Sequence, residues 1–240
     1  MMQKIYQDIL VAKAQDKKLL AILLDPDKIE MDNLTLLFEK IKSSPATHIF
    51  VGGSIVKSNK IDELVLFLKE RVSLPILLFP GNPSQISTFA DGILFLSLLS
   101  GRNPDYLIEH HVNAVPILKK SNLEVISTGY LLIESGGQTA VERVSQTKPL
   151  DRNKHEIVCQ TAKAGEFLGN KLIYLEAGSG AQLAVPLEMI TAVSKEISIP
   201  LIVGGGIRSQ EAIQDAFNAG ADLVVIGNAF ENDSNFFNYS

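Results

Sequence analysis

The sequence predicts a single-domain α/β protein whose 240 residues form one (β/α)8 TIM barrel with an N-terminal helix. Eight short runs rich in apolar residues alternate with segments of helical periodicity, without the turn spacing of a Greek key. Residues 200–230 read as strand, glycine loop, helix, strand and glycine loop, which is typical of the last two units of such a barrel. Polar residues gather after the strands, whereas Pro75 and Pro200 stand before them. An open doubly wound sheet is the structural alternative.

Composition and charge narrow the functional classes. Hydrophobic residues make up 46% of the chain, enough for one large core, and no low-complexity linker divides residues 1–240. The net charge of −5 argues against nucleic acid or an anionic membrane surface as a partner, because either needs a broad cationic face. Cys159 is the only cysteine, which excludes an internal disulfide and suits a reducing compartment.

The apolar segments indicate a cytoplasmic protein without a transmembrane segment. Residues 1–18 alternate polar and apolar residues at helical spacing and lack the apolar core of a signal peptide, so we expect a surface helix there. Residues 74–79 and 93–99 are far shorter than the roughly 20 residues that a membrane-spanning helix needs.

Each strand is expected from a short apolar run that ends at glycine or a polar residue. The first run is apolar throughout, as expected for a strand covered on both sides, and it ends at Asp25. Three glycines end the seventh run, and Gly227 follows the eighth. The expected strands are residues 19–24, 49–51, 76–79, 93–96, 124–127, 172–175, 201–203 and 223–226.

The intervening helices are expected from apolar residues at helical spacing. Ser209 stands at the N-cap position of the last one, Gly220 ends it, and Pro186 is well placed in the first turn of the helix before it. Other helices are expected from about residue 33, over residues 61–70, through residues 106–115 and over residues 153–168.

Two connections depart from the regular pattern. Only a short helix around residues 84–89 fits between the third and fourth strands, so the third helical slot is underfilled. Residues 128–149 show no clean periodicity, and we expect them to lie over the top face of the barrel as an excursion.

Three successive glycine loops predict a phosphate site. They are YLEAGSGA at residues 174–181, IVGGGIRS at 202–209 and VVIGNAF at 224–230. One glycine loop alone is more often a simple turn, but three at neighbouring strand ends favour backbone N–H groups that close on a phosphate. The nucleotide-binding pattern G-x-x-x-x-G-K-[ST] is absent from the sequence.

Asp25 and Ser54 follow the first two expected strands and are the candidate metal ligands. Because strand carboxyl ends share one mouth in a barrel, their oxygens would face a common space. Mg²⁺ is commonly held by one or two such oxygens together with substrate phosphate. The alternative is that Asp25 merely caps a turn or helix.

Glu176 and Tyr174 are the candidate catalytic residues. A carboxylate beside phosphate would repel it, so Glu176 is better suited to accept a proton or to hold substrate hydroxyls. The alternative role for Glu176 is to hold a loop amide. None of the four histidines is assigned to metal or catalysis.

Six motifs together resemble the geranylgeranylglyceryl phosphate synthase family, which includes the bacterial heptaprenylglyceryl phosphate synthases. They are LLDPDK at 23–28, VGGS at 51–54, TGYLLIESGG at 128–137, YLEAGSGA at 174–181, IVGGGIRS at 202–209 and IGNAF at 226–230. The resemblance implies a TIM barrel that transfers a polyprenyl group, geranylgeranyl here, from its diphosphate to the 3-hydroxyl of sn-glycerol 1-phosphate, with Mg²⁺.

The resemblance also implies roles for individual residues. Mg²⁺ would lie at Asp25 and Ser54, and Glu176 would accept the proton of the attacking hydroxyl. Lys28 and Lys57 are candidates for stabilising the departing diphosphate. The residues implied for glycerol phosphate are Tyr174, Leu175, Glu176, Ala177, Gly178, Ser179, Gly180, Gly205, Gly206, Gly227 and Asn228.

Several further expectations concern partners and alternatives. The underfilled slot after Phe79 would leave an apolar groove for a prenyl tail. A homo-oligomer is expected, and the aromatic C-terminal tail at Phe236, Phe237 and Tyr239 would pack on its own barrel, join a neighbour or make peripheral contact with lipid. The competing functions are a phosphate-binding barrel isomerase or lyase and a non-catalytic phosphometabolite-binding barrel.

Overall fold

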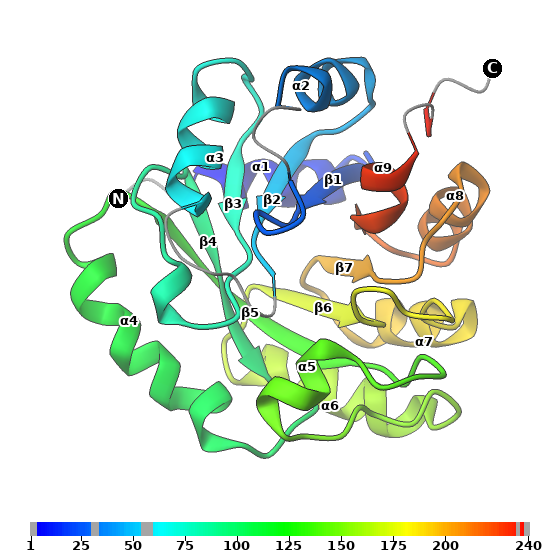
Figure 1. The fold of residues 1–240 in the computed structure, drawn as a ribbon. Coiled ribbons are helices and arrows are strands. Elements are labelled where there is room, and N and C mark those ends of the chain that lie inside the picture. Colours follow the sequence, from blue (N-terminus) through cyan, green and yellow to red (C-terminus); the bar gives the residue numbers. More distant parts are fainter. Residues whose placement is uncertain (1–3, 30–33, 54–59, 234–235, 238–240) are drawn as a thin grey trace.

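Eight parallel strands form a closed barrel in sequence order from β1 to β8, with helices on the outside (Figure 1). The computed structural model describes residues 4–29, 34–53, 60–233 and 236–237, without the side chain of Asn232. The ring closes where β1 pairs with β8, in a register that sets Leu19 against Leu223. The predicted barrel is therefore confirmed, and the alternative of an open sheet is wrong.

The strands are β1 (Leu19–Leu24), β2 (His48–Val51), β3 (Ile76–Leu78), β4 (Gly92–Leu98), β5 (Glu124–Leu132), β6 (Leu172–Glu176), β7 (Leu201–Gly204) and β8 (Leu223–Ile226). The helices are α1 (Lys4–Ala14), α2 (Leu34–Ser43), α3 (Lys60–Lys69), α4 (His110–Leu118), α5 (Ala140–Ser145), α6 (His155–Phe167), α7 (Leu187–Glu196), α8 (Gln210–Asn218) and α9 (Asn228–Asn232). Two further short segments are the 3-10 turn η2 (Pro83–Gln85) and the π-helical η3 (Asp105–Glu109). Ser209 caps α8 as predicted, because its side chain accepts the N–H of Ala212.

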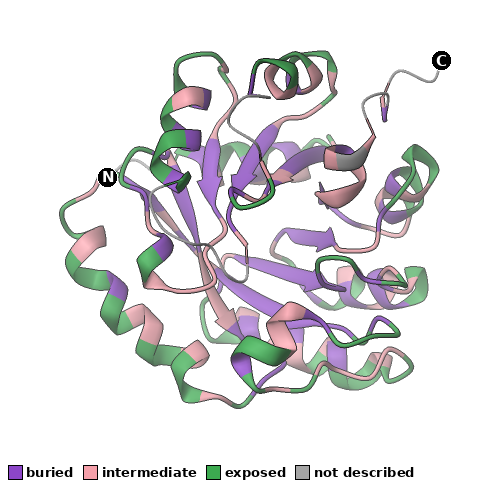
Figure 2. Ribbon diagram, viewed as in Figure 1, coloured by how far each residue is buried: buried purple, intermediate pink, exposed green. Residues whose placement is uncertain are grey.

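The strands separate two buried apolar layers. Figure 2 shows the strands buried within a ring of partly exposed helices. Side chains such as Phe50, Leu94 and Tyr174 fill the barrel interior. Their neighbours along the strands, such as Leu175, pack outward against the helices. Because successive side chains of a strand point to opposite faces, each strand supplies both layers and is apolar throughout.

Helix α1 closes the barrel at the amino ends of the strands, and contacts with the barrel hold both ends of the helix. Ile5 and Ile9 join the interior layer. The backbone N–H groups of Ile5 and Tyr6 both donate to the Glu124 carboxylate, each at 2.8 Å. At the other end, Lys13 forms a 2.8 Å ion pair with Asp222 at the start of β8. The expected N-terminal helix thus forms the floor of the barrel.

We expect Glu124→Ala to lower the free energy of unfolding by about 2 kcal/mol, because two amides at the start of α1 lose their acceptor in a buried position. Denaturant unfolding measures this change. Glu39→Ala, at an exposed position of α2, is the control and should change stability by less than about 0.5 kcal/mol. Equal losses in the two variants would show that Glu124 does not hold α1.

The underfilled slot is confirmed, because β3 and β4 are joined without an α-helix. The connection holds the single 3-10 turn η2, in which the Asn82 side chain accepts the N–H of Ser84 at 2.9 Å. The Gln85 side chain accepts the N–H of Gly81 at 2.8 Å, which folds the segment tightly over the end of β3. The outer wall beside β3 and β4 is consequently thin.

The prediction for residues 128–149 is wrong in its first five residues, which continue β5 to Leu132. Both faces of this segment are buried, so it shows no alternation that would reveal a strand. Gly129 packs closely there, because a Cβ would lie 2.8 Å from a Leu99 methyl and 2.9 Å from an Ile173 methyl, so those side chains would have to shift. The remainder of the segment does form an excursion, which carries α5.

The described part of the C-terminal tail packs on its own barrel. Phe236 is buried in the outer layer, and its carbonyl accepts the side-chain amide of Gln210 at 2.9 Å. Phe237 packs edge-on against Phe236 at 4.9 Å between ring centroids. Tyr239 lies outside the described residues.

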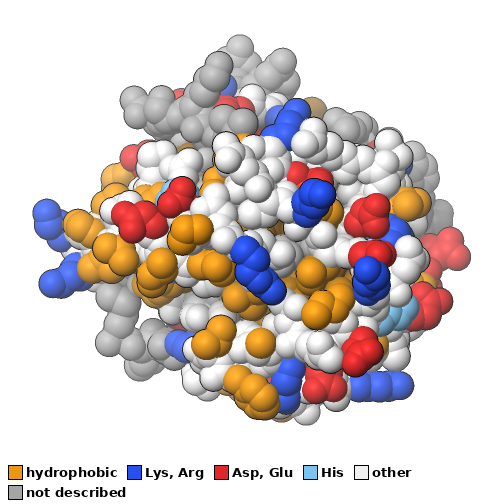
Figure 3. All heavy atoms as spheres, turned by 90° about the horizontal axis from the view of Figure 1, so that it is seen from below, with side chains coloured by type: hydrophobic (Ala, Val, Ile, Leu, Met, Phe, Trp, Pro, Cys, Tyr) orange, Lys and Arg blue, Asp and Glu red, His pale blue; other side chains and the backbone are white. Residues whose placement is uncertain are grey.

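No helix in the described ranges has the length and apolar character needed to cross a membrane. Exposed apolar side chains do occur at the surface. Ile108, Val112 and Val115 lie along η3 and α4, and Figure 3 shows hydrophobic side chains gathered on that face of the molecule.

Candidate active site

A cavity of about 850 Å³ lies at the carboxyl ends of the strands, and we call it the mouth cavity. Its wall includes Asp25, Gly53, Phe79, Gly205 and Gly227, each of which follows the end of a different strand. Glycine backbone and side chains of both charges share this wall. It is therefore the polar end of the barrel, opposite the floor formed by α1.

Most of the predicted site residues meet in this cavity, and two do not. The side chains of Leu175 and Ala177 pack in the outer layer, because they alternate with Tyr174 and Glu176 along the chain. The Ala177 N–H is also occupied by the Gly204 carbonyl at 3.0 Å. Ser54 lies outside the described residues. The predicted residues that line the cavity are Asp25, Tyr174, Glu176, Gly178, Ser179, Gly180, Gly205, Gly206, Gly227 and Asn228.

Glu176 ends β6 and turns a carboxylate into the mouth while its residue as a whole remains 5% exposed. One oxygen, Oε1, accepts the N–H of Gly178 at 2.6 Å. Burial raises the pKa of Glu176 above its usual value, and the Gly178 amide and the Tyr174 phenol act in the opposite direction. A carboxylate with a raised pKa is a stronger base than a free one, which suits acceptance of a proton from a hydroxyl.

Tyr174 lies beside this carboxylate within a cluster of three aromatic rings. Its ring centroid is 5.5 Å from those of Phe79 and Tyr130. Tyr174 Oη and the Glu176 carboxylate are close enough to shift each other's pKa, although the pair does not reach good hydrogen-bond geometry. Burial, together with the nearby Glu176 charge, raises the pKa of Tyr174 well above 10, so the phenol stays neutral. A neutral phenol beside the carboxylate can donate either to Glu176 or to a ligand hydroxyl.

The glycine loops adopt conformations that other residues would disturb. Gly178, Gly180, Gly205 and Gly206 all have φ between +72° and +103°. At Gly205, a Cβ would collide with Glu176 Oε1 and would lie 2.6 Å from the Gly178 nitrogen and 2.8 Å from the Ala177 nitrogen. The β6 and β7 loops therefore approach backbone to backbone, and this close approach is what places Glu176 against the glycine loops.

Asp25 and Lys28 lie on the rim of the mouth after β1, the strand that pairs with β8. Asp25 Oδ1 accepts the N–H of Asp27 at 3.1 Å, so this carboxylate does cap its own turn, as the alternative reading held. Oδ2 lies 3.7 Å from the Lys28 ammonium. Glu231 on α9 accepts the N–H of Asp25 at 3.2 Å, which ties the β1 loop to the end of the barrel.

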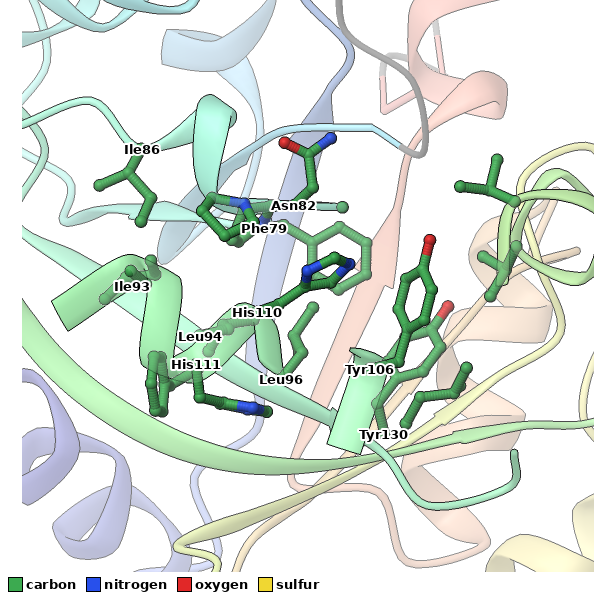
Figure 4. Close-up of a pocket in the computed structure, with 18 of the residues that line it drawn as sticks. Phe79, Asn82, Ile86, Ile93, Leu94, Leu96, Tyr106, His110, His111 and Tyr130 are labelled. Carbon is green, nitrogen blue, oxygen red and sulfur yellow. The ribbon is translucent and has the colours of Figure 1, made fainter. Parts of the chain in front are cut away.

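A second hollow, the apolar groove, runs beside the connection from β3 to β4, which contains no α-helix. Figure 4 shows its labelled side chains, among them Phe79, Leu96, Tyr106 and Tyr130. Its two histidines lie against aromatic rings, His110 at 4.7 Å from Tyr106 and His111 at 4.4 Å from Phe95 between centroids. The groove is lined by Gly53, Phe79, Pro80, Gly81, Asn82, Pro83, Ile86, Ile93, Leu94, Phe95, Leu96, Leu98, Tyr106, His110, His111, Ala114, Tyr130, Val141 and Val144.

The mouth cavity and the apolar groove share one wall. Gly53, Phe79, Tyr130 and Val141 line both of them, and we call these residues the junction. Three belong to β2, β3 and β5 or their loops, and Val141 comes from α5. A capping box between Thr139 and Glu142 starts α5, and Thr139 lies where a Cβ on Gly178 would sit. The excursion thus carries α5 to the line where the two hollows meet.

Sequence reasoning missed several of these residues. Glu231 and Arg143 both line the mouth, but α9 and α5 have five and six residues and give little periodic signal. Tyr130 and Phe79 line the junction, and Tyr130 lies in the segment that the sequence predicts to be an excursion. The sequence signal for Tyr130 is its spacing. It stands two positions after Thr128, and residues two apart on a strand point to the same face, which for Tyr130 is the barrel interior.

Comparisons with known proteins identify the family of this chain. A model of the PcrB family matches residues 13–238. The chain belongs to the PcrB family. Among its family relatives, the geranylgeranylglyceryl phosphate synthase of Flavobacterium johnsoniae is 66% identical over 97% of this chain and 96% of its own. The protein of the same name from Korarchaeum cryptofilum is 41% identical over 90% of this chain and 88% of its own.

Solved structures agree with the family. The (S)-3-O-geranylgeranylglyceryl phosphate synthase of Thermoplasma acidophilum, in complex with sn-glycerol-1-phosphate, matches this PcrB family chain with a TM-score of 0.91 and 32% identity, covering 99% of this chain and 95% of that one. The α-subunit of tryptophan synthase from Legionella pneumophila matches with a TM-score of 0.55 and 17% identity, over 95% of this chain and 87% of its own. The latter likeness shows the barrel fold alone.

Proposed function

We propose that this chain is a Mg²⁺-dependent prenyltransferase that joins a polyprenyl group, geranylgeranyl in the first instance, to the 3-hydroxyl of sn-glycerol 1-phosphate and releases diphosphate. The observation that carries the proposal is the junction, where a polar cavity and an apolar groove share four residues. A prenyl diphosphate has a charged end and an apolar tail. Lying across the junction, it would present its first carbon to an acceptor held in the mouth.

The apolar groove supports a tail of this kind. Its lining combines aliphatic side chains of β4 with Phe79, Tyr106 and Tyr130, and Ala114 of α4 forms part of the far wall. Each methylene that leaves water on entering such a groove stabilises the complex by about 0.8 kcal/mol. The groove exists because the third helical slot is underfilled, which connects the predicted departure from the barrel pattern to the chemistry of the donor.

The chemistry assigned to Glu176 follows from its place beside the junction. In the proposed reaction, the bond between the first prenyl carbon and the diphosphate oxygen breaks, and a bond to the glycerol 3-oxygen forms. The proton of that hydroxyl passes to the Glu176 carboxylate. The hydroxyl of Tyr174, buried beside the Glu176 carboxylate, would orient the glycerol hydroxyls.

The glycine loops support binding of the acceptor phosphate. Gly178, Gly180, Gly205 and Gly206 leave the backbone uncovered on the wall of the mouth, which favours close approach of an anion. Asn228 lies across from them, with its Nδ2 at 3.9 Å from the position of a Cβ on Gly180.

The described residues fit a magnesium ion held mainly by phosphate oxygens. Asp25 supplies a carboxylate at the rim, and residues 4–29, 34–53, 60–233 and 236–237 contain no cluster of three or more His, Cys, Asp or Glu residues that would enclose a metal. Mg²⁺ is commonly bound in this way, by one or two carboxylates with substrate phosphates. When bound, Mg²⁺ would neutralise charge that develops on the departing diphosphate. Ser54 stays a prediction as the second ligand.

A cation near the junction would favour the charged end of the donor. Arg143 on α5 lines the mouth two residues from Val141 and is exposed. Its guanidinium has five donors and suits phosphate oxygens. Lys57, which is predicted together with Lys28 to stabilise the departing diphosphate, lies outside the described residues.

We expect Ala114→Phe to lower kcat/KM for geranylgeranyl diphosphate at least about tenfold, because a phenyl ring would fill space in the apolar groove and several buried methylenes would lose their contacts. The ten-carbon geranyl diphosphate should lose less, since fewer carbons occupy the groove. Steady-state kinetics with both donors measures the contrast. Val112→Phe places the same phenyl ring at an exposed position of α4 and is the control. Equal losses for both donors would contradict the assignment of the groove.

Product analysis tests the proposed function directly. The chain is incubated with sn-glycerol 1-phosphate and geranylgeranyl diphosphate, with Mg²⁺ and with Mg²⁺ removed by a chelator. We expect a prenyl ether in the first case and little or none in the second. An isomerase or lyase would instead convert a phosphorylated compound without releasing diphosphate. No ether with any prenyl length would refute the proposal.

A further inference from the structure

The Lys28 side chain crosses the rim of the mouth and reaches the phosphate loops. Its ammonium donates to Asn228 Oδ1 at 2.7 Å and to Ser179 Oγ at 3.4 Å. Asn228 is the first residue of α9, directly after β8, and Ser179 lies in the loop after β6. On its other side the same nitrogen lies 3.7 Å from Asp25 and 3.8 Å from Glu231. One cation therefore lies beside two of the predicted phosphate-loop residues and one predicted metal ligand.

We infer that Lys28 binds the phosphate of the glycerol phosphate acceptor, and not the diphosphate of the donor. The inference rests on the proposed function for the identity of the acceptor. Both partners on the loop side are neutral oxygens, whereas a phosphate oxygen is a charged and stronger acceptor for an ammonium. A phosphate held by the glycine loops would lie within reach of the three N–H donors of the Lys28 ammonium.

The hydrogen bonds of Lys28 favour the acceptor over the donor. They go to Ser179 in the loop after β6 and to Asn228 at the start of α9, whereas Asp25 and Glu231 lie farther from the ammonium, at 3.7 and 3.8 Å. The junction borders Asp25 instead, because β2 pairs with β1 and a Cβ on Gly53 would lie 3.1 Å from the Asp25 carboxylate. A donor whose tail lies in the apolar groove would therefore bring its charged end to Asp25 and to Arg143 of α5, while Ser179 and Asn228 line the mouth without belonging to the junction.

The surroundings of Lys28 fix the place of its charge. Lys40 on α2 donates to the Phe230 carbonyl at 2.6 Å and stands over the Phe230 ring at 4.7 Å, which holds α9 against the barrel. Glu231, on the same helix, lies at ion-pair distance from Lys28 and also accepts the Asp25 N–H. The ammonium is thus flanked by two carboxylates on one side and faces the phosphate loops on the other.

Calorimetric titration with sn-glycerol 1-phosphate alone, without donor and without Mg²⁺, tests the inference. Replacing Lys28 by glutamine should raise the Kd of glycerol phosphate about tenfold to hundredfold, because one charged hydrogen bond is lost. Lys28→Arg should recover part of the affinity, since it keeps the charge. Arg143→Gln removes one positive charge from the same mouth without touching Ser179 or Asn228, and it should change this Kd by less than about threefold.

Kinetics completes the test. In Lys28→Gln the KM for glycerol phosphate should rise about tenfold or more, and the KM for geranylgeranyl diphosphate should change by less than about threefold. The reverse pattern would assign Lys28 to the diphosphate and overturn the inference, as would an unchanged Kd in a variant whose thermal unfolding matches the parent. If the parent binds glycerol phosphate through Lys28 yet forms no ether, this inference holds and the proposed function fails.

Discussion

Replacing Glu176 by glutamine is expected to lower kcat for ether formation by a factor of about 10² to 10⁴, the range over which a positioned general base contributes. Glutamine keeps the shape of the side chain and an oxygen that accepts the Gly178 N–H, but it cannot take a proton. The KM for glycerol phosphate should change much less than kcat. Steady-state rates with saturating donor measure the loss.

The stability of the Glu176→Gln variant provides a second prediction. The pKa of Glu176 in the fold is raised by burial, so the folded state binds the proton more tightly than the unfolded chain does. Stability therefore falls as the pH rises from the ordinary glutamate pKa through the raised one, and this loss persists at neutral pH. Glu176→Gln has no such ionisation, so we expect its free energy of unfolding at neutral pH to equal or exceed that of the parent.

The pH dependence of the parent enzyme follows from the same shift. Activity should require ionised Glu176 and should be lost as the pH falls through its raised pKa, above the range of an exposed glutamate. A Glu176→Gln variant that keeps more than about a fifth of the parent kcat would show that the proton leaves by another route. A stability loss in this variant would instead show that the carboxylate serves mainly to hold the loop.

Gly205→Ala is expected to cost about 3 kcal/mol or more of stability and to remove most of the activity. Gly205 has a φ of +80°, and a Cβ would meet Glu176 Oε1 and two backbone nitrogens. Strain of the left-handed backbone contributes about 1 to 2 kcal/mol, and the collision adds a similar amount. Because backbone stands on two sides, relief must come from displacement of Glu176 or of the β6 loop. Denaturant unfolding and the ether assay measure the two effects.

Gly169→Ala separates strain from collision. Gly169 has a φ of +90° at the end of α6, but nothing lies within 4 Å of a Cβ there. We expect this control to lose about 1 to 2 kcal/mol of stability and to keep its activity. Similar activity in the two alanine variants would contradict the view that the close approach of the β6 and β7 loops positions the catalytic carboxylate.

The sequence predicts the barrel and one side of its mouth because both depend on patterns within short stretches of the chain. Short apolar runs ending in glycine identify the strand ends, and Asp25, Glu176 and the glycine loops follow directly from them. Their meeting in one cavity is a consequence of barrel closure. The underfilled slot could be predicted because a missing helix shortens the distance between two strands along the chain.

The other side of the mouth depends on contacts between distant parts of the chain. The continuation of β5 is hidden because both of its faces are buried, and Tyr130 is hidden with it. Nothing local predicts that Glu231 holds the amide of Asp25, a contact between residues 206 positions apart. Leu175 and Ala177 show the converse, since a continuous motif includes positions whose side chains alternate away from the cavity.

The structure of a ternary complex tests the central claim most directly. The chain would be crystallised with sn-glycerol 1-phosphate and geranylgeranyl thiodiphosphate, in which a sulfur replaces the bridging oxygen and slows the reaction. We expect the tail in the apolar groove and the first prenyl carbon at the junction, about 3 to 3.5 Å from the glycerol 3-oxygen. That oxygen should lie within hydrogen-bond reach of Glu176. A tail outside the groove, or glycerol hydroxyls out of reach of Glu176, would contradict the account.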